Sequence, residues 1–566
     1  MSNYKLYPSR KIHNLREMLD ESASRFGIST AFLQKVDGKY KPYSYNRFKS
    51  DVDALGTALT ARGFAGKRII VTGENCYMWC VSYMTAVCGL GVVVPVDKEI
   101  PAEEIANIAK ISEASLILYS KKYEHKLASV DESVTKICFD DISDLIFEGK
   151  TILESGNRDY FDISIDVDAL CSLIFTSGTT GVSKGVMLSQ RNLCCNIENL
   201  AKLVKVEPGD TALSVLPLHH VYECTAGFLF PMSRGASIGF SEGVRYIMKN
   251  LKEVRPTKML CVPLLIETMY NKIWANIRKK GIEHKVRNVI KATDIIKPAS
   301  ARMAAKRKAF AEIHNSMGGN LNLIVSGGAP IDPEVLRGMR QFGFRIIQGY
   351  GLTECGPLAA VNPDTASKDI SAGVVLPGGE FKIINKGEDG IGEICYRGDN
   401  VMLGYYKQPE MTAEIKKNGW LFTGDLGYVD EDGYLIITGR KKNIIVTANG
   451  KNIFPEELET YLSRSPFVSE CVVVGIMNEK KKDYDIVALV YPNFEYAKEV
   501  FGLKADSMLY EALSSAVDGV NSIVQSYKRI NMMILRNDEF PKSSSRKIKR
   551  IGIVDSVMDE YLALRG

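Results

Sequence analysis

The chain lacks several features that would place it in a whole class of proteins. None of its twelve cysteines forms a Cys-x-x-Cys pair, and most lie within apolar stretches. Reduced, buried thiols are therefore expected, rather than a disulfide framework or a zinc site. The longest apolar stretch, residues 84–96, is broken by two glycines and a proline and is shorter than the ~20 residues that span a bilayer. The sequence has no zinc finger, RNP signature or aromatic-basic alternation, which argues against nucleic-acid binding.

We also expect no secretory leader, since the first residues (Met-Ser-Asn-Tyr-Lys) contain no apolar core. The composition is that of an ordinary globular protein, because 45% of the 566 residues are hydrophobic and 25% are charged. This length is too great for a single core and indicates about two to four domains. The expected location is cytoplasmic, with peripheral contact at the inner face of the membrane as an additional hypothesis.

The small net charge of +5 is unevenly distributed. Residues 276–312 contain eleven Lys and Arg against three acids, a local balance of +8, among regularly spaced apolar residues such as Ile282, Val286 and Ile290. One interpretation is a basic amphipathic helix pair that contacts an anionic membrane or attracts an acidic ligand. The other interpretation is a solvated helical face. The sequence leaves both open.

The most informative segment is residues 174–189, Ile-Phe-Thr-Ser-Gly-Thr-Thr-Gly-Val-Ser-Lys-Gly-Val-Met-Leu-Ser. An apolar strand runs into a loop of Gly, Ser and Thr, whose backbone N–H groups and hydroxyls can converge on an anion. Lys184 adds a compact positive charge, so the loop predicts a polyphosphate site. The order of residues differs from a Walker A loop, and a second strand is expected before a helix from about Ser189. A solvated linker is the alternative interpretation.

From residue 14 to about residue 175, helical and strand-like segments alternate, which predicts parallel sheets covered by helices on both faces. We expect helices at 15–26, 45–62, 78–89 and 103–112, and strands at 68–72, 92–96 and 115–119. The fold class expected is α/β, with a large N-terminal domain of parallel or mixed sheets covered by helices.

The pattern changes near Gly433, where a strand-like segment ends in a short basic connector, residues 440–443. Beyond it we expect a compact α+β segment, with helices at 455–464, 507–517 and 551–564 and strands at 468–475 and 485–491. We therefore place the domain boundary at the connector. Residues 1–440 form the large domain, and residues 441–566 form a small C-terminal lid domain.

Four further motifs accompany the loop. Residues 216–223 (Leu-Pro-Leu-His-His-Val-Tyr-Glu) place two histidines after a strand, and residues 326–332 (Ser-Gly-Gly-Ala-Pro-Ile-Asp) form a glycine turn. Residues 348–354 (Gln-Gly-Tyr-Gly-Leu-Thr-Glu) are expected to pack an aromatic ring, a hydroxyl and a carboxylate into one tight turn. Residues 419–425 (Gly-Trp-Leu-Phe-Thr-Gly-Asp) end on an acid in a glycine bend, where it can accept two hydroxyl hydrogen bonds. Each motif alone is weak evidence.

Together and in this order, the motifs closely resemble the adenylate-forming superfamily of acyl-CoA synthetases, luciferases and nonribosomal adenylation domains. The resemblance extends from about residue 14 to residue 550. Four segments are most similar in sequence to long-chain fatty acid–CoA ligases: residues 216–223, 439–446, 451–457 and 541–548. One departure is Arg546, which stands where most of the superfamily has the glycine before the final catalytic lysine; it puts the backbone freedom of that loop in question.

The resemblance implies a ligase that activates a fatty acid, with long chains favoured, as acyl-AMP with release of pyrophosphate, and then transfers the acyl group to CoA. The implied cofactors are ATP, Mg²⁺ and CoA. In a second hypothesis the acyl group passes to the phosphopantetheine arm of an acyl carrier protein. In a third, the chain is a non-catalytic acyl- or nucleotide-binding protein. Four intact residues argue against the third: Lys184, Glu354, Asp425 and Lys547.

The resemblance also implies which residues bind the nucleotide. The β- and γ-phosphates are held by the glycine-rich loop, through Thr176, Ser177, Gly178, Thr179, Thr180, Gly181 and Lys184. Adenine is held by Tyr350 and its flanking glycines on one side and a turn on the other, through Gly349, Tyr350, Gly351, Gly328, Ala329 and Pro330. Asp425 takes both ribose hydroxyls, and Arg440 helps to fix the ribose.

The implied catalytic residues are Lys547, Glu354, Thr353, His220 and Lys184. Glu354 ligates Mg²⁺, a hard cation that favours carboxylate and phosphate oxygens. Thr353 touches the α-phosphate, and Lys547 bridges the acyl carboxylate and the α-phosphate. His220 lies at the entrance to the acyl pocket, with a structural histidine as the alternative.

Two half-reactions at one site imply a moving domain. Lys442 matches the hinge position of the family, and rotation there would bring the loop with Gly450 to the pantetheine channel; a solvated linker is the alternative. The acyl pocket is expected from residues 220–227, 262–268 and 327–351, whose small and apolar side chains suit an alkyl chain. In these stretches we expect no acid that would pair with a substrate amine.

Overall fold

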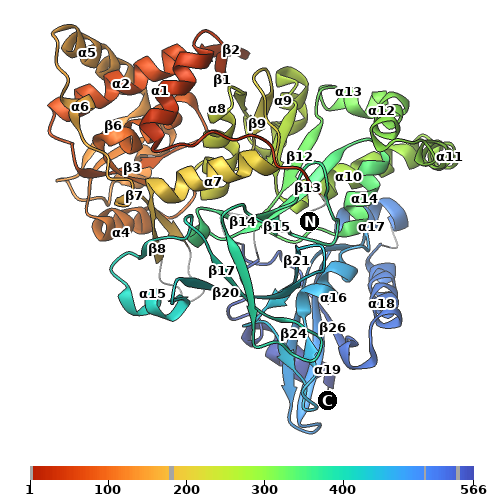
Figure 1. Cartoon of the computed structure of the whole chain (residues 1–566). Coiled ribbons are helices and arrows are strands. Elements are labelled where there is room, and N and C mark those ends of the chain that lie inside the picture. Colours follow the sequence, from red (N-terminus) through yellow and green to blue (C-terminus); the bar gives the residue numbers. More distant parts are fainter. Residues whose placement is uncertain (1–3, 177–183, 503–504, 543–547, 566) are drawn as a thin grey trace. The chain divides into compact units, whose positions relative to one another are not determined.

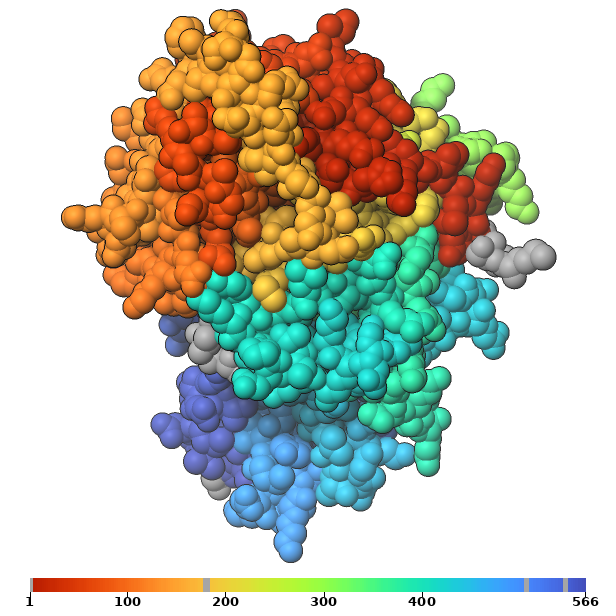
Figure 2. Space-filling model, turned by 60° about the vertical axis from the view of Figure 1, so that its left-hand side comes forward, coloured from red at the N-terminus to blue at the C-terminus, as the bar shows by residue number. Residues whose placement is uncertain are grey.

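The computed structural model describes residues 4–176, 184–502, 505–542 and 548–565. The chain divides into two compact units. Unit 1 comprises Met1–Phe381, Tyr396–Leu421 and Asp430–Leu435, and unit 2 comprises Lys382–Cys395, Phe422–Val429 and Ile436–Gly566. The domain boundary at residue 440 stays a prediction. In Figure 2, the segments coloured red to yellow, all from unit 1, form one packed surface.

The first sheet of unit 1 contains the strands β15-β14-β13-β12-β11-β9-β10-β1-β2 in this order (Figure 1), and β15 pairs on its other side with the first residues of β21 (Tyr434–Arg440). Strands β13, β12, β11, β9, β10 and β1 pair in parallel, whereas β2, β14 and β15 pair antiparallel with their neighbours. The bounds are β1 (Thr30–Val36), β2 (Lys39–Ser44), β9 (Thr211–Ser214), β10 (Ser237–Phe240), β11 (Lys258–Cys261), β12 (Leu323–Ser326), β13 (Arg345–Gly351), β14 (Leu358–Val361) and β15 (Gly373–Val375).

The second sheet of unit 1 has the order β18-β8-β7-β4-β3-β5-β6. The bounds are β3 (Lys67–Thr72), β4 (Gly91–Val96), β5 (Ala114–Tyr119), β6 (Thr135–Cys138), β7 (Leu170–Thr176), β8 (Lys184–Ser189) and β18 (Gly404–Tyr405). These positions confirm the three predicted strands in this region. The mixed pairing arises at the β7–β8–β18 edge, where both contacts are antiparallel.

Helices cover both sheets, as the alternation predicted. The principal ones in unit 1 are α1 (Leu15–Phe26), α2 (Tyr45–Ala61), α3 (Tyr77–Thr85), α4 (Ala102–Ser112), α5 (Ile142–Glu154), α7 (Gln190–Leu203), α9 (Ile247–Val254), α10 (Pro263–Lys279), α11 (Glu283–Asp294), α12 (Ala299–Ala309), α13 (Ala311–Ser316), α14 (Pro333–Gln341) and α15 (Pro409–Ile415). Against the first sheet, Ile266 of α10 and Met339 of α14 pack with Met259 and Ile346 in one buried cluster. Such apolar burial is the main source of folding free energy.

One predicted helix, residues 78–89, differs in the structure. The regular helix α3 ends at Thr85, and a π-helical turn continues it to Leu90. Gly89 has φ +129°, and a Cβ at Gly91 would lie 2.0 Å from the carbonyl oxygen of Lys67. The helix therefore ends where the chain must approach β3 closely, which only glycine allows.

The predicted start of a helix at Ser189 is confirmed. Ser189 Oγ accepts the Asn192 N–H at 3.2 Å, and Asn192 Oδ1 accepts the Ser189 N–H at 2.9 Å. This reciprocal capping satisfies two backbone donors that a helix start otherwise leaves unpaired. Strand β8 therefore passes directly into α7, which fixes the strand edge that carries Lys184.

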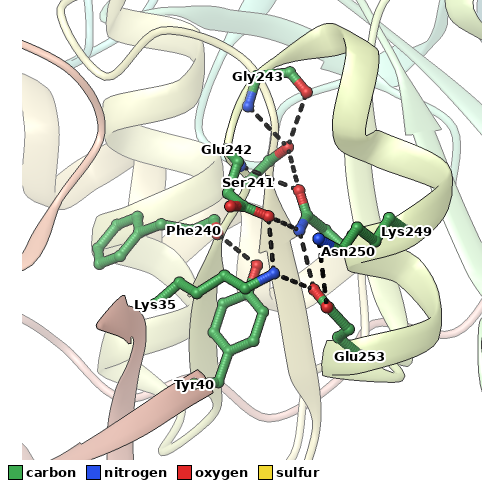
Figure 3. Close-up of polar contacts among 9 residues, drawn as sticks. All are labelled: Lys35, Tyr40, Phe240, Ser241, Glu242, Gly243, Lys249, Asn250 and Glu253. Atoms are coloured by element: carbon green, nitrogen blue, oxygen red, sulfur yellow. Dashed lines mark hydrogen bonds and ion pairs between the residues drawn. The ribbon is translucent and has the colours of Figure 1, made fainter. Parts of the chain in front are cut away.

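A buried ammonium joins the β1–β2 hairpin to the chain after β10 (Figure 3). The Lys35 Nζ lies 2.8 Å from Glu242 Oε2 and 2.7 Å from Glu253 Oε2, with its side chain only 8% exposed. Asn250 Nδ2 donates to Glu242 Oε2 at 2.8 Å, and the Tyr40 hydroxyl donates to the Phe240 carbonyl at 2.8 Å. Hydrogen bonds to Glu242 and Glu253 raise the pKa of Lys35, so the network keeps its charge while it holds the hairpin in place.

Unit 2 has the α+β character that its sequence predicts. A sheet of order β24-β25-β26 is accompanied by helices, with bounds α16 (Pro455–Leu462), β24 (Val468–Asn478), β25 (Asp483–Pro492), α17 (Phe494–Phe501), α18 (Ala505–Ile523), β26 (Met532–Leu535) and α19 (Met558–Arg565). Leu458 and Leu462 pack with Val473 and Ala488 in its core. The final helix is shorter than the predicted 551–564, because a 3₁₀ turn at Asp555–Val557 precedes it. In the described part of the chain, no helix is long and apolar enough to cross a membrane.

Candidate functional site

The predicted phosphate loop connects two paired strands of unit 1. Thr176 at the end of β7 lies opposite Lys184 at the start of β8. Both residues are partly exposed, so the ammonium of Lys184 is available to a ligand at this edge. The other loop residues predicted to bind phosphate lie outside the described residues: Ser177, Gly178, Thr179, Thr180 and Gly181. The predicted catalytic Lys547 also lies outside them.

Tyr405 links Lys184 to Glu354. The Lys184 Nζ lies 5.3 Å from the centroid of the Tyr405 ring, within the range of a cation–π contact. On its other side, the Tyr405 hydroxyl donates to Glu354 Oε1 at 2.7 Å. Burial and the adjacent Glu354 raise the pKa of Tyr405, so the phenol stays protonated and acts as a neutral donor. Sequence reasoning missed Tyr405, which β18 places beside Val186 of β8.

Glu354 is suited to the predicted magnesium role. It lies in a single 3₁₀ turn with Thr353, between β13 and β14, and is partly exposed. Among the described residues, no group of three or more His, Cys, Asp or Glu side chains could hold a metal ion. Mg²⁺ usually keeps several waters and binds through one or two carboxylates together with substrate phosphates. A single carboxylate beside a predicted phosphate loop therefore fits this cation.

The predicted adenine residues come together at the carboxyl ends of two parallel strands. Ser326 of β12 is paired with Gln348 of β13, so the turn that follows β12 lies beside the end of β13. The turn residues Gly328, Ala329 and Pro330 are exposed. Ligands of open α/β sheets commonly bind at such strand ends.

The expectation that residues 348–354 form one tight turn is wrong. Gly349, Tyr350 and Gly351 are the last residues of strand β13, and the turn begins only at Thr353. Tyr350 pairs antiparallel with Ala360 of β14, and this ladder keeps the segment extended. A Cβ at Gly351 would lie 1.8 Å from the Pro357 carbonyl oxygen, so the glycine is required by the close approach of the returning chain.

The predicted ribose residues lie together in unit 2. Arg440 Nε is 2.7 Å from Asp425 Oδ1, and the Asp425 side chain is 5% exposed. The backbone N–H of Asp425 donates to Thr423 Oγ1 at 3.1 Å, which holds the backbone at this residue, while Arg440 holds the carboxylate. Asp425 lies within β20 (Trp420–Val429), so the predicted glycine bend is corrected to a strand in which Gly424 has φ +69°. The pair fits the predicted hydroxyl-binding role, because a fixed carboxylate accepts several hydrogen bonds.

The predicted hinge and pantetheine residues also belong to unit 2. Lys442 is exposed, next to Lys441, whose Nζ lies 2.7 Å from Glu393 Oε2. Gly450 closes the hairpin of β22 (Ile445–Val446) and β23 (Asn452–Ile453) with φ +71°, and a Cβ there would meet no atom within 4 Å. The open space is compatible with close passage of a ligand, and both roles stay predictions.

The two predicted histidines follow β9, and their environments differ. His219 is 8% exposed, and burial, followed by the neighbouring His220 and Lys98, holds its pKa well below the usual range. His220 is partly exposed, and its ring centroid lies 4.2 Å from that of His219. His219 is therefore a neutral packing residue. His220 is the more exposed of the two, and its role at the pocket entrance stays a prediction.

A cavity of about 50 Å³ lies in unit 1 between the first sheet, α7 and the π-helical segment η4 (Glu223–Leu229). Its lining is almost wholly apolar: Leu200, Val204, Val206, Ala212, Leu213, Tyr222, Glu223, Ala226, Gly227, Phe230, Pro231, Ala236, Lys258, Met259, Leu260, Leu323, Val325, Gly349, Leu358 and Val361. Two of the three stretches predicted for the acyl pocket contribute to this lining. Residues 262–268 do not belong to the lining, and Leu264 among them is 56% exposed.

The cavity contains an acid that sequence reasoning discounted. Glu223 is 0% exposed, and its Oε1 accepts the Ser214 hydroxyl at 2.5 Å. Burial raises the pKa of the Glu223 carboxyl to about 8, so it is mostly neutral at pH 7 and offers no fixed charge to a substrate amine. A Cβ at Gly227 would lie 2.7 Å from the Glu223 carboxyl carbon, which explains why a glycine occupies the next turn.

Comparisons with known proteins show the family of this chain. A family model described as AMP-binding enzyme matches residues 19–406, and one described as AMP-binding enzyme C-terminal domain matches residues 442–560. Human long-chain-fatty-acid–CoA ligase 1 is 30% identical over 511 residues, covering 82% of this chain and 71% of that protein. Long-chain-fatty-acid–CoA ligase FadD15 of Mycobacterium bovis is 29% identical, covering 78% and 77%.

Two solved structures share the fold. ATP-bound MatB from Rhodopseudomonas palustris superposes with a TM-score of 0.75 at 22% identity, covering 97% of this chain and 99% of that one. A fatty acyl CoA synthetase from Mycobacterium tuberculosis gives a TM-score of 0.64 at 22% identity, covering 98% and 99%. The predicted fold class, α/β with a smaller α+β C-terminal domain, is therefore confirmed.

Proposed function

Because the chain belongs to the AMP-binding enzyme family, we propose that it is a fatty acid–CoA ligase. It uses ATP to convert a fatty acid into acyl-AMP, with release of pyrophosphate, and then transfers the acyl group to the thiol of CoA. Relatives named long-chain-fatty-acid–CoA ligases support a long-chain substrate. The structural observation that carries the proposal is the arrangement of Lys184 and Glu354 on either side of Tyr405.

The first half-reaction must overcome charge repulsion. The acyl carboxylate attacks the α-phosphorus, and the bond from that phosphorus to the pyrophosphate oxygen breaks. Like unit charges ~4 Å apart repel by about 4 kcal/mol at an effective dielectric near 20. Lys184 offsets the charge of the β- and γ-phosphates, and Lys547 offsets that of the acyl carboxylate and α-phosphate. Bound at Glu354, Mg²⁺ would supply further neutralisation of phosphate oxygens.

The substrate class follows from the cavity. An almost wholly apolar lining favours a hydrocarbon chain. The one acid in it, Glu223, is mostly neutral at pH 7 because burial raises its pKa to about 8. His220, partly exposed on the turn before Glu223, is proposed as the residue at the pocket entrance.

The second half-reaction needs a thiol where Lys547 acted before. We infer that rotation about Lys442 withdraws Lys547 and brings the hairpin with Gly450 to the pantetheine channel. The exposure of Lys442 and the open space around Gly450 support this assignment. Domain motions of this kind commonly separate two reaction steps that require different groups at the same position in the active site.

The basic segment, residues 276–312, is relevant to which molecule accepts the acyl group, because it could bind an acidic partner. The structure resolves it into the end of α10, then α11, α12 and α13 instead of a helix pair. Its three acids are used internally, because Lys280 pairs with Glu312, Arg287 with Glu283 and Lys306 with Asp294. The remaining cations support contact with an acidic surface, either an acyl carrier protein or an anionic membrane. These two partners stay hypotheses, and free CoA is the acceptor that the relatives support.

The decisive test is pyrophosphate release with a panel of C6 to C18 fatty acids and aryl acids, followed by thioester formation with CoA alone. We expect the highest rates with the longer linear acids and thioester formation without any carrier protein. Lys547→Ala should slow acyl-AMP formation by ~100-fold or more, because it removes a charge aimed at the reacting atoms. Acyl-AMP formation at an undiminished rate in this variant would contradict the proposed geometry. If none of the acids in the panel caused pyrophosphate release, the proposed function itself would be contradicted.

A further inference from the structure

A short segment of unit 1, residues 400–405, binds both sides of the predicted phosphate and metal site; we call it the strap. The Met402 N–H donates to the Glu354 carbonyl at 2.9 Å, and the Leu403 N–H donates to the Met187 carbonyl at 2.9 Å. Asn400 Nδ2 donates to the Cys355 carbonyl at 2.9 Å. The strap therefore connects strand β8, which begins with Lys184, to the turn that carries Glu354.

α7 and α15 hold the strap in turn. Asn192 Nδ2 of α7 donates to the Val401 carbonyl at 3.0 Å, and Asn196 Nδ2 of α7 donates to the Cys355 carbonyl at 2.8 Å. At the end of the strap, the Tyr405 N–H donates to Thr412 Oγ1 of α15 at 2.8 Å. Tyr405 is 6% exposed, so its ring has little freedom to turn. A side chain whose own position is fixed by its surroundings can orient neighbouring side chains more precisely than a mobile one can.

We propose that Tyr405 is a positioning residue for the metal-bound nucleotide: its hydroxyl orients the Glu354 carboxylate, and its ring directs the Lys184 ammonium. The inference rests on the proposed function, in which Glu354 and Lys184 face the phosphates of ATP. The 2.7 Å hydrogen bond from the Tyr405 hydroxyl occupies one lone pair of Glu354 Oε1. A carboxylate has about four such sites, so the others remain for a metal ion and its waters.

The chemistry explains why a tyrosine suits this position. A lysine or arginine in its place would also orient Glu354, but its positive charge would compete with a divalent cation for the carboxylate. A phenol donates one hydrogen bond and adds no formal charge. Its ring face is negative and attracts an ammonium, and the Lys184 Nζ lies 5.3 Å from the ring centroid. The hydroxyl of the same side chain holds Glu354 through a hydrogen bond.

The test uses the full chain and a binding readout that does not need turnover. The affinity for α,β-methylene ATP, which cannot release pyrophosphate, is measured by calorimetry with Mg²⁺ and with EDTA. We expect Tyr405→Phe, which keeps the ring, to weaken binding about 10-fold with Mg²⁺, the size of one hydrogen bond to a charged group, and to leave binding in EDTA unchanged. Tyr405→Leu should weaken binding in both conditions, because Lys184 then also loses its aromatic support.

Tyr406→Phe is the matched control, since the neighbouring tyrosine hydroxyl lies 3.5 Å from Glu113 and not at Glu354. It should bind like the parent protein in both conditions. In the adenylation assay, Tyr405→Phe should raise the Mg²⁺ concentration needed for half-maximal rate more than it lowers kcat. Equal losses with Mg²⁺ and with EDTA would overturn the proposal, and so would no loss in either. A parent protein that binds the analogue normally but makes no acyl-AMP would instead refute the proposed function.

Discussion

Two regions of unit 1 place a glutamate in opposite settings. Beside the predicted phosphate loop, Glu354 is partly exposed and accepts a hydrogen bond from the Tyr405 hydroxyl. The ring of the same tyrosine contacts the Lys184 ammonium. In the apolar cavity, Glu223 is 0% exposed and accepts the Ser214 hydroxyl, and burial raises its pKa to about 8. Each carboxyl accepts one hydroxyl, so hydrogen bonding is not what separates them.

The difference is solvation. A carboxyl group removed from water without a cation nearby takes up a proton, because an unpaired buried charge is costly. Beside the predicted phosphate loop, Glu354 is partly exposed and contacts the same tyrosine, Tyr405, as the Lys184 ammonium. We propose that the partly exposed glutamate is the metal ligand and that the buried one is a neutral part of the acyl pocket. Replacing each carboxyl by its neutral amide tests this contrast directly.

Glu354→Gln should have the largest effect. The amide keeps an acceptor for Tyr405 but removes the negative charge that binds Mg²⁺. We expect the rate of acyl-AMP formation to fall ~100- to 1,000-fold, as for other single electrostatic contacts to a transition state, with a weaker dependence on Mg²⁺ concentration. Pyrophosphate release measured across a magnesium titration gives both quantities. A variant with more than half the parent rate and the same magnesium dependence would show that Glu354 is not the metal residue.

Asp425→Asn should have an intermediate effect, because the amide keeps one acceptor oxygen. Asp425 is proposed to bind the ribose hydroxyls and is paired with Arg440 at 2.7 Å. Loss of the charge weakens both contacts, and a hydrogen bond to a charged group contributes about 1.5–3 kcal/mol. We expect the KM for ATP to rise ~10- to 100-fold with a smaller change in kcat. The measurement is initial rate against ATP concentration, and 2′,3′-dideoxy-ATP is the control, since it should not distinguish parent from variant.

The sequence predicted the parts of this comparison that depend on local pattern. The Gly, Ser and Thr run with Lys184, the acid at position 354 and the strand–helix alternation are visible in consecutive residues. The sequence predicts a helix from about Ser189, after a second strand, and the capping box of Ser189 with Asn192 confirms this start. Patterns of this kind act within a few residues, so they survive without knowledge of the fold.

The sequence could not predict what depends on distant contacts. Tyr405 meets partners whose positions in the chain are 51 and 221 residues earlier, at Glu354 and Lys184. The β18–β8 pairing and the hydrogen bond from Met402 to Glu354 bring them together. The sequence predicts Asp425 in a glycine bend, whereas it lies within strand β20, next to Gly424 with φ +69°. The protonation of Glu223 follows from burial, which no neighbouring residue reveals. In each case tertiary structure overrides the local preference.

Glu223→Gln should have the smallest effect on activity. It tests the contrast between Glu223 and Glu354 through the pH dependence of folding stability. The parent carboxyl changes pKa from an ordinary 4.5 to about 8 on folding. Between these values the folded protein holds a proton that the unfolded chain has lost, so stability falls as the pH rises through this window, by up to ~1.4 kcal/mol for each pH unit. An amide has no such proton, and the variant should lose less stability over the same range.

The measurement is the urea midpoint of unfolding at pH 5 and pH 8 for the parent and for Glu223→Gln, followed by pyrophosphate release at pH 7. We expect a clearly smaller drop in midpoint for the variant and a rate within about threefold of the parent, because the neutral amide resembles the neutral acid that the cavity already contains. Equal drops in midpoint would mean that Glu223 is charged in the folded protein. A loss of rate as large as that of Glu354→Gln would place Glu223 in the catalytic machinery, and the contrast between the two regions would fail.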